Sequence, residues 1–246
     1  MESKTDFLEV AISHPAGRSS WDTFQFRCSG LPNLMANGKK KGEGMGDSAK
    51  YNLRDIWVGE RLGRRNYDNV NKYTKKGTMV ESDSLELVSN VLGRPIFKNI
   101  ESLSNGWIKG TPDVIKPELR DIKSSWDART FFHIDMEKAL STYYWQLMGY
   151  MALTGAKEAH LTYVLVDTPV ELAEGDLYRM SFNLQEDEID KARRNYSFGD
   201  IPERSRIKNF IIPRDESAIE QIFLRVMEAR IYLKEFDIIN GITENL

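Results

Sequence analysis

The sequence is poor in the residues that build cross-links and soft-metal sites. Cys28 is the only cysteine, and the three histidines, His14, His133 and His160, lie far apart along the chain. One cysteine excludes an intrachain disulfide framework, a cysteine-ligated zinc site and a four-cysteine iron–sulfur cluster. The scattered histidines argue against a multi-histidine metal site. So little cysteine is typical of a cytoplasmic protein.

Long apolar runs are also missing. No stretch approaches the roughly 20 apolar residues that a membrane helix needs. Residues 1–20 lack the basic start and apolar centre of a signal peptide. We therefore expect no membrane association. With 41% hydrophobic residues the chain can still bury a sizeable core, and 246 residues suit a single domain spanning 1–246.

The chain lacks an overall excess of positive charge, but one segment has such an excess. The net charge is −3, whereas residues 38–76 hold eleven Lys or Arg and five Asp or Glu, so that segment is +6 and the remainder −9. A basic arm on an acidic body is typical of polyanion binders. Lys39, Lys40 and Lys41, in a Gly-rich stretch, are candidate ligands of DNA phosphates. The alternative is a solvated loop without partners.

Hydrophobic periodicity predicts a mixed α/β fold. Helical spacing indicates helices over 48–62, 78–92, 136–154 and 214–236. Ser48 is expected to cap the first helix, and the first three helices should end at glycines: Gly63, Gly93 and Gly155. Apolar alternation and apolar runs indicate strands over 94–115, 120–126 and 158–169. This order predicts a central mixed β-sheet flanked by helices, with a basic loop and helix at 38–76 and a helical extension from about residue 170.

Charged residues interrupt the expected strands in IKGTPDVIKPELRDIKSSWD, residues 108–127. Side chains two apart on a strand share a face, so Asp121 and Lys123 should point the same way. A turn near Pro117 would bring Asp113 beside Asp121. Adjacent carboxylates repel each other unless they share a proton or a cation, and Mg²⁺ or Mn²⁺ with oxygen ligands fits. Lys123 would orient or deprotonate an attacking water, or stabilise charge on a phosphate.

These residues resemble the motif of the PD-(D/E)xK nuclease superfamily: Pro112-Asp113, then Asp121-Ile122-Lys123. The resemblance implies a restriction-endonuclease-like core in which Asp113 and Asp121 bind the metal. The Ile122 carbonyl would be a further ligand. It also implies an acid on the preceding helix, for which Glu81 is the candidate and Glu86 the alternative.

The helix over 136–154 carries a second part of the resemblance. Gln146 and Tyr150 lie at i and i+4, on one helix face. A Q-x-x-x-Y helix marks a subset of these nucleases that works on DNA ends. The resemblance implies that Gln146 positions the water, Lys123 or a metal-bound carboxylate, and that Tyr150 belongs to the DNA-binding surface. The alternative is an ordinary core helix with one amide.

Within the superfamily the chain is similar to the YqaJ-type phage recombination exonucleases, the group that includes lambda exonuclease. KGTMVE places Gly77 four residues before Glu81, as in that group. Arg129 follows Lys123 by six residues, where the group has an arginine for a terminal 5′-phosphate. Ser29, in FRCSGLPNLM, matches its phosphate-binding serine.

The chain departs from that group at two positions. Asp121 stands where the group usually has glutamate. Asp22 stands where an arginine is expected, so Arg18 or Arg27 would have to substitute. The alternative for these two residues is that Arg129 pairs with a nearby acid such as Asp127 and that Ser29 only caps a helix.

The resemblance implies a Mg²⁺- or Mn²⁺-dependent deoxyribonuclease, an exonuclease on double-stranded DNA ends in phage-type recombination. It further implies a homo-oligomeric ring, a single-strand annealing protein as partner, and the host cytoplasm as location. Alternatives are an endonuclease on the same fold, a non-catalytic nucleic-acid-binding protein, and a sheet protein with a chance motif. Convergence of Glu81, Asp113, Asp121 and Lys123 within a few ångströms is the structural requirement of the nuclease hypothesis.

Overall fold

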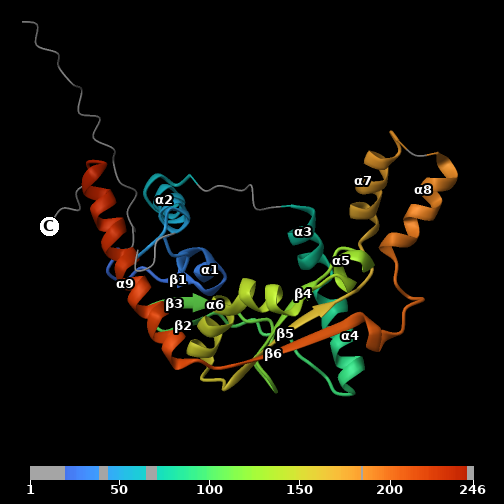
Figure 1. Ribbon diagram of the computed structural model, residues 1–246, viewed down its shortest axis with the longest axis horizontal. Helices are drawn as coiled ribbons and strands as arrows, with labels where there is room; N and C mark the ends of the chain where they lie inside the picture. The colour runs from blue at the N-terminus through green and yellow to red at the C-terminus, as the bar shows by residue number, and fades with distance from the viewer. Residues whose placement is uncertain (1–19, 39–43, 65–70, 184, 243–246) are drawn as a thin grey trace, which may run out of the picture.

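Helices surround two small mixed β-sheets in the computed structural model, which describes residues 20–38, 44–64, 71–183 and 185–242 (Figure 1). The strands are β1 (Phe26–Arg27), β2 (Leu103–Ser104), β3 (Ile108–Gly110), β4 (Arg120–Ser124), β5 (Glu158–Val164) and β6 (Ile207–Pro213). The helices are α1 (Leu31–Leu34), α2 (Asp47–Leu62), α3 (Lys72–Met79), α4 (Glu81–Leu92), α5 (Ala128–Phe132), α6 (Met136–Thr154), α7 (Val170–Met180), α8 (Glu186–Arg193) and α9 (Glu216–Ile239). The predicted mixed α/β class is confirmed, with the sheet divided in two: β1-β3-β2 and β4-β5-β6.

The second sheet holds the central strand β5 between two neighbours. β4 runs parallel to β5, with Asp121 opposite Leu161 and Lys123 opposite Tyr163. A parallel pair needs a crossover connection, and α6 lies within it. β6 runs antiparallel on the other side of β5. The predicted helical extension from about residue 170 contains α7, α8 and α9 but is interrupted by β6, because the short apolar run NFIIP completes the sheet.

The predicted hairpin is present, but it is minimal. Val114 and Arg120 form one antiparallel bridge, with N–H···O distances of 3.1 and 3.0 Å in the two directions. Strands predicted over 94–115 form only at β2 and β3. Residues 94–102 form no strand, and the Asn99 side chain makes local hydrogen bonds there instead. Its Nδ2 donates to the carbonyls of Glu101 and Pro112, at 2.9 and 3.0 Å.

The predicted glycines end their helices as expected, whereas the predicted serine N-cap of α2 is not observed. Gly63, Gly93 and Gly155 terminate their helices with φ of 66°, 66° and 72°, the left-handed conformation that favours glycine. Ser48 does not cap α2, because Gly46 holds the N-cap position and Ser48 lies inside the helix. The helix predicted over 78–92 is two helices, α3 and α4, which meet at Val80.

Close packing fixes α6 against the first sheet. Cys28 is fully buried between β3 and α6. A Cβ on Gly110 would lie 2.7 Å from Tyr150 Cε1, and a Cβ on Gly149 would lie 2.6 Å from Leu31 Cδ1. Only glycine allows so close an approach at these two points. The contact sets the depth of α6, the helix that carries Gln146 and Tyr150.

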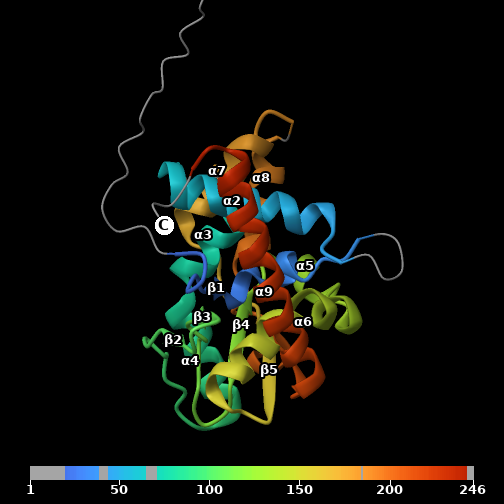
Figure 2. The same cartoon turned by 90° about the vertical axis from the view of Figure 1, so that its left-hand side faces the viewer.

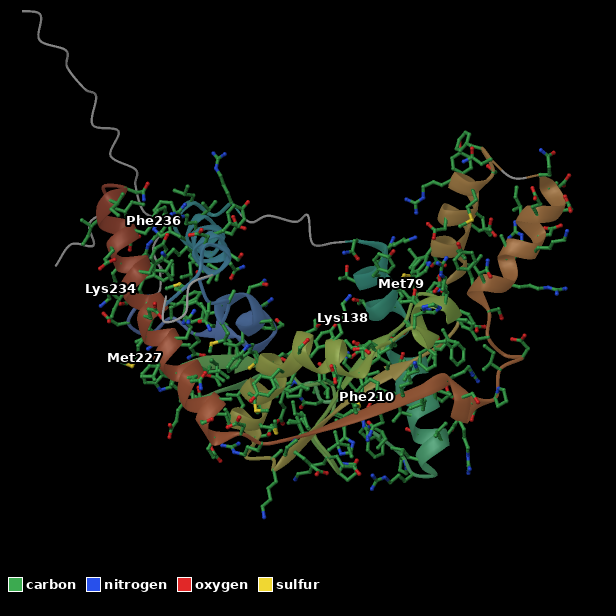
Figure 3. All side chains as sticks on the ribbon, in the orientation of Figure 1. Met79, Lys138, Phe210, Met227, Lys234 and Phe236 are labelled. Atoms are coloured by element: carbon green, nitrogen blue, oxygen red, sulfur yellow. The ribbon has the colours of Figure 1, made fainter. Side chains whose placement is uncertain are left out.

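Two groups of helices rise from opposite ends of the sheet layer, α2 with α9 at one end and α7 with α8 at the other (Figures 1 and 2). α3, α5 and the start of α6 lie between them (Figure 1). In Figure 3, Lys138 marks the start of α6 and Met79 the end of α3 in this middle region. No helix among the described residues is long and apolar enough to cross a membrane.

Part of the basic segment serves the fold. Lys76 is fully buried, and its Nζ donates to the carbonyls of Ser125 (2.7 Å), Val166 (2.9 Å) and Trp126 (3.0 Å) and to Thr168 Oγ1 (2.9 Å). Arg61 is also buried and pairs with an acid on α9. Lys72 lies 2.6 Å from Asp176 Oδ2. All three cations have partners within the protein, carbonyls and a hydroxyl for Lys76 and carboxylates for Arg61 and Lys72, so the +6 of residues 38–76 overstates the charge that faces solvent.

Candidate active site

Asp113 and Asp121 meet where the hairpin joins the second sheet. Asp113 Oδ2 accepts a hydrogen bond from the Ile122 amide at 2.6 Å. Asp121 is 2% exposed, and its Oδ1 accepts from Gln146 Nε2 at 3.0 Å. The structure therefore brings Asp113, Asp121 and Gln146 together from β4, the turn before it, and α6.

Lys123 completes this group from the same face of β4. Its Nζ lies 2.8 Å from Asp121 Oδ2. The contact is an ion pair, and Lys123 is the partner of this buried oxygen within the described residues. Burial lowers the pKa of Lys123, but the Asp121 carboxylate outweighs burial and the net pKa lies above its usual value. Lys123 is thus an ammonium at neutral pH, which favours orientation and charge stabilisation over proton abstraction.

The two carboxylates affect each other's ionisation. Burial and the neighbouring Asp121 charge raise the pKa of Asp113 from 3.8 to about 6, against the lowering effects of the Ile122 amide and Lys123. Two acids held this close in a partly dry site favour a shared proton or a cation. Near neutral pH a divalent cation can take the place of that proton.

Glu81 lies near this pair but is turned to another partner. It begins α4, and its Oε2 lies 2.6 Å from Lys98 Nζ. Its charge contributes to the raised pKa of Asp113. Within the described residues, however, no three acid, histidine or cysteine side chains are close enough to form a metal-binding group. The expectation that Glu81 converges tightly with Asp113 and Asp121 is not met here. Glu86, the alternative, is exposed further along α4.

The residues present fit a hard divalent cation. Two adjacent carboxylates that share one ammonium, and a raised Asp113 pKa, describe a site with excess negative charge. Mg²⁺ is commonly held by one or two carboxylates together with waters. The set therefore fits Mg²⁺ or Mn²⁺ without a third preassembled carboxylate, and Glu81 could join by leaving Lys98.

Gln146 and Tyr150 form an inner support for Asp121. Gln146 Nε2 donates to the Tyr150 hydroxyl at 3.1 Å as well as to Asp121 Oδ1. Of the three roles predicted for Gln146, this contact corresponds to orientation of a carboxylate. Tyr150 is only 5% exposed. Its predicted place on the DNA-binding surface is therefore wrong, because the close approach of Gly110 encloses its ring.

The predicted DNA ligands lie on the surface or outside the described residues. Arg129 is exposed in the first turn of α5, and the described structure gives its side chain no ion pair. Asp127 does not pair with it but caps α5, accepting from the Thr130 amide at 2.6 Å. Ser29 is exposed on a short 3₁₀ turn before α1. Lys39, Lys40, Lys41 and Arg18 lie outside the described residues.

Two tyrosines near Lys123 escaped the sequence analysis. The Tyr143 ring centroid lies 4.8 Å from Lys123 Nζ. Tyr163 is opposite Lys123 in the register of β4 and β5. Tyr143 precedes Gln146 by three residues, so helical spacing could have placed it on the same face. Nothing in the sequence indicates the strand register that places Tyr163.

Known structures share this architecture. The chain is similar to a phage-related exonuclease from Haemophilus somnus 129PT, with 27% identity, 90% of this chain and 97% of that chain covered, and a TM-score of 0.75. The chain has the phage-exonuclease fold. An alkaline exonuclease from Laribacter hongkongensis, LHK-Exo, shares the phage-exonuclease fold at 16% identity and TM-score 0.57, over 87% of this chain and 92% of that one. No protein-family model and no curated protein matches the sequence.

The phage-exonuclease fold confirms the resemblance to the lambda exonuclease-like nucleases. In the sequence, the resemblance began with the Asp113, Asp121 and Lys123 motif, and these three residues lie together in the folded chain. Both lines of evidence support a nuclease.

Proposed function

We propose that this chain is a divalent-metal-dependent DNA exonuclease. The observation that carries the proposal is the pair of Asp121, which is buried, and Asp113, which is half-buried, with Lys123 and Gln146 beside Asp121, on a fold shared with a phage-related exonuclease. Two neighbouring carboxylates, one buried and one half-buried, with one ammonium have a net negative charge when both are ionised, and a bound cation offsets that charge.

Each side chain has a separate part in the proposed reaction. Asp113 and Asp121, with the Ile122 carbonyl and Glu81, would hold Mg²⁺ or Mn²⁺. Such an ion, when bound, would supply Lewis acidity at the scissile phosphate. Lys123 orients the attacking water and offsets charge on the scissile phosphate. Gln146 fixes the rotamer of Asp121 through its contact to Oδ1.

The proposed substrate is double-stranded DNA with free ends. A structure of LHK-Exo holds dAMP, which supports a nucleotide ligand for the fold. Arg129 offers an exposed guanidinium that can bind a terminal phosphate with two hydrogen bonds. Lys39, Lys40 and Lys41 would follow the backbone. A ring-shaped homo-oligomer, an annealing-protein partner, a role in phage recombination and a cytoplasmic location belong to the same proposal.

Chelation and substrate topology test the proposal together. A chelator should abolish cleavage of linear duplex DNA, and Mg²⁺ or Mn²⁺ should restore it, whereas Ca²⁺ should bind without supporting turnover. Closed circular duplex should resist cleavage that degrades the linear form. Cleavage that survives chelation contradicts the metal assignment. Digestion of closed circles favours the endonuclease, and DNA binding without cleavage favours the non-catalytic binder.

End recognition by Arg129 is tested with matched ends. Linear duplexes with 5′-phosphate should be degraded faster than those with 5′-hydroxyl, and Arg129→Ala should lose this preference while it keeps residual cleavage. Arg179→Ala is a suitable control, because Arg179 is also exposed but pairs with Asp176. Equal rates on both ends in the wild type would exclude 5′-phosphate recognition but not the nuclease.

A further inference from the structure

The Lys123 ammonium has two neighbours of different chemistry. One is Asp121 Oδ2, 2.8 Å away. The other is the face of the Tyr143 ring, with its centroid 4.8 Å from Nζ. Both lie within the range of a favourable contact with a cation, since a cation–π contact extends to about 6 Å. The side chain is 27% exposed, so it is not sealed in one position.

These two contacts respond differently to a metal ion. Asp121 is a candidate metal ligand, and a divalent cation at its carboxylate would compete with the ammonium for the same oxygen. The Tyr143 ring is neutral and ligates no hard cation, so its contact with Lys123 does not compete. In the proposed nuclease, Tyr143 is therefore the contact that remains when Asp121 changes partner.

The ring is itself held in place by an aromatic layer. Tyr163 of β5 packs edge-on against Tyr143 of α6, with ring centroids 6.4 Å apart, and Phe210 of β6 packs edge-on against Tyr163 at 6.2 Å. Figure 3 labels Phe210 on β6. Burial is the main cause of the raised pKa of Tyr163, and the neighbouring Tyr143 is the second. The Tyr163 hydroxyl therefore stays neutral. The layer spans three elements and gives the Tyr143 ring a defined orientation.

We infer that Tyr143 is a positioning residue for Lys123, holding the ammonium at the edge of the carboxylate site through its ring face. This inference rests on the proposed nuclease function. It requires the aromatic ring of Tyr143 and not its hydroxyl. It adds a specific partner for Lys123 from α6, the same helix that orients Asp121 through Gln146.

Kinetics of three variants test the inference. Tyr143→Leu should lower kcat on linear duplex DNA about 5- to 30-fold, the factor that loss of a cation–π contact corresponds to. The KM for DNA should stay near that of the wild type. Tyr143→Phe should retain the wild-type rate because it keeps the ring. Tyr144→Leu is the matched control, since Tyr144 is the next residue on α6 and binds Asp215 instead.

A spectroscopic measurement without metal supplies an independent readout. In protein labelled with ¹³C-lysine, the ε-methylene signal of Lys123, assigned with Lys123→Arg, should be shifted upfield by the Tyr143 ring. The shift should persist in Tyr143→Phe and Tyr144→Leu and vanish in Tyr143→Leu. Circular dichroism and thermal unfolding establish that each variant is folded.

The outcomes separate the inference from the proposed function. Equal rates for Tyr143→Leu and Tyr144→Leu overturn the inference, and so does a loss of rate in Tyr143→Phe equal to that in Tyr143→Leu. An unshifted Lys123 signal in the wild type overturns it as well. If the wild type does not cleave DNA with any divalent metal, the proposed function fails, while the ring shift still decides whether Tyr143 holds Lys123.

Discussion

Two buried aspartates, Asp121 and Asp237, show how the supply of hydrogen-bond donors separates a structural acid from a reactive one. Asp237 is 4% exposed on α9. Its Oδ1 accepts from Trp57 Nε1 (2.6 Å) and Arg61 Nε (2.9 Å), and its Oδ2 from Trp21 Nε1 (2.5 Å) and Arg61 Nη2 (2.6 Å). Asp121 is equally buried, yet it has one amide donor, one ion pair and a second carboxylate beside it.

The two carboxylates differ in the number of hydrogen-bond donors that contact their oxygens. Both oxygens of Asp237 are hydrogen-bonded, and a carboxylate satisfied in this way ties elements together. Its donors come from α2 and from the start of the described chain, so it fixes α9 to both. Asp121 has one amide and the partly exposed Lys123 ammonium as partners and faces a like charge on Asp113, an arrangement that stability alone does not favour. Excess charge of that kind is typical of a site built for a ligand.

The largest contrast should come from Asp121→Asn. The substitution removes a proposed metal ligand, so the rate of cleavage should fall about 10³-fold. Stability should change by less than in Asp237→Ala, because the relief of repulsion between Asp121 and Asp113 offsets the loss of the Lys123 ion pair. Initial rates with Mn²⁺ and urea unfolding measure the two effects. A large loss of stability would place Asp121 in the same structural class as Asp237.

Asp237→Ala should show the opposite pattern. It leaves the Arg61 guanidinium buried without its carboxylate, which should cost about 3–5 kcal/mol of unfolding free energy. Asp22→Ala is the matched control, because Asp22 also pairs with a cation of α9, Lys234, but at the exposed surface. That variant should unfold almost as the wild type does. Similar urea midpoints for the two variants would contradict the structural role of Asp237.

A titration of the carboxylate pair should separate the two regions further. Because the pKa of Asp113 is raised from 3.8 to about 6, the folded state binds this proton more tightly than the unfolded state. Without metal, the contribution of this group to unfolding free energy should be greatest below its unfolded pKa and fall as the pH rises toward about 6. Ca²⁺ affinity should rise over the same range, with proton release detectable by calorimetry in buffers of different ionisation enthalpy. An affinity that does not change with pH would argue against Asp113 as a ligand.

The smallest expected effect concerns surface charge. Neutralising Lys39, Lys40 and Lys41 should weaken DNA binding for all sequences alike. Each lost phosphate contact lowers the slope of log affinity against log salt by about 0.9 on duplex DNA, so the triple variant should lose about 3. Lys191→Gln is a control, because Lys191 is exposed but already paired with Asp187. An unchanged slope would identify a solvated loop.

Local signals in the sequence predicted the elements that carry the site. α6 runs from Met136 to Thr154 as predicted, because a polar cap, Asp135, and a left-handed glycine, Gly155, delimit it. The Asp121-x-Lys123 spacing required only the alternation of a strand. The turn containing Pro117 was enough to indicate that Asp113 returns beside Asp121.

Long-range partners could not be predicted in this way. β6 pairs with β5 across more than forty residues, with Pro213 opposite Glu158, and only the folded sheet reveals it. Glu81 was predicted as a metal ligand because it precedes the hairpin, but its carboxylate pairs with Lys98. The basic character of residues 38–76 was counted as surface charge, although Lys76 and Arg61 are buried. Each difference arises because a side chain's partner, and not its type, decides its role.

The buried Lys76 provides a chemical probe of the fold. Because its Nζ is surrounded by three carbonyls and a hydroxyl, an acylating reagent can reach it only when α3 separates from the ends of β4 and β5. Lys75, its exposed neighbour, serves as an internal reference for reagent strength. The ratio of the two labelling rates, followed by mass spectrometry, would report the opening of this junction in the native protein, without a mutation and without unfolding the rest of the chain.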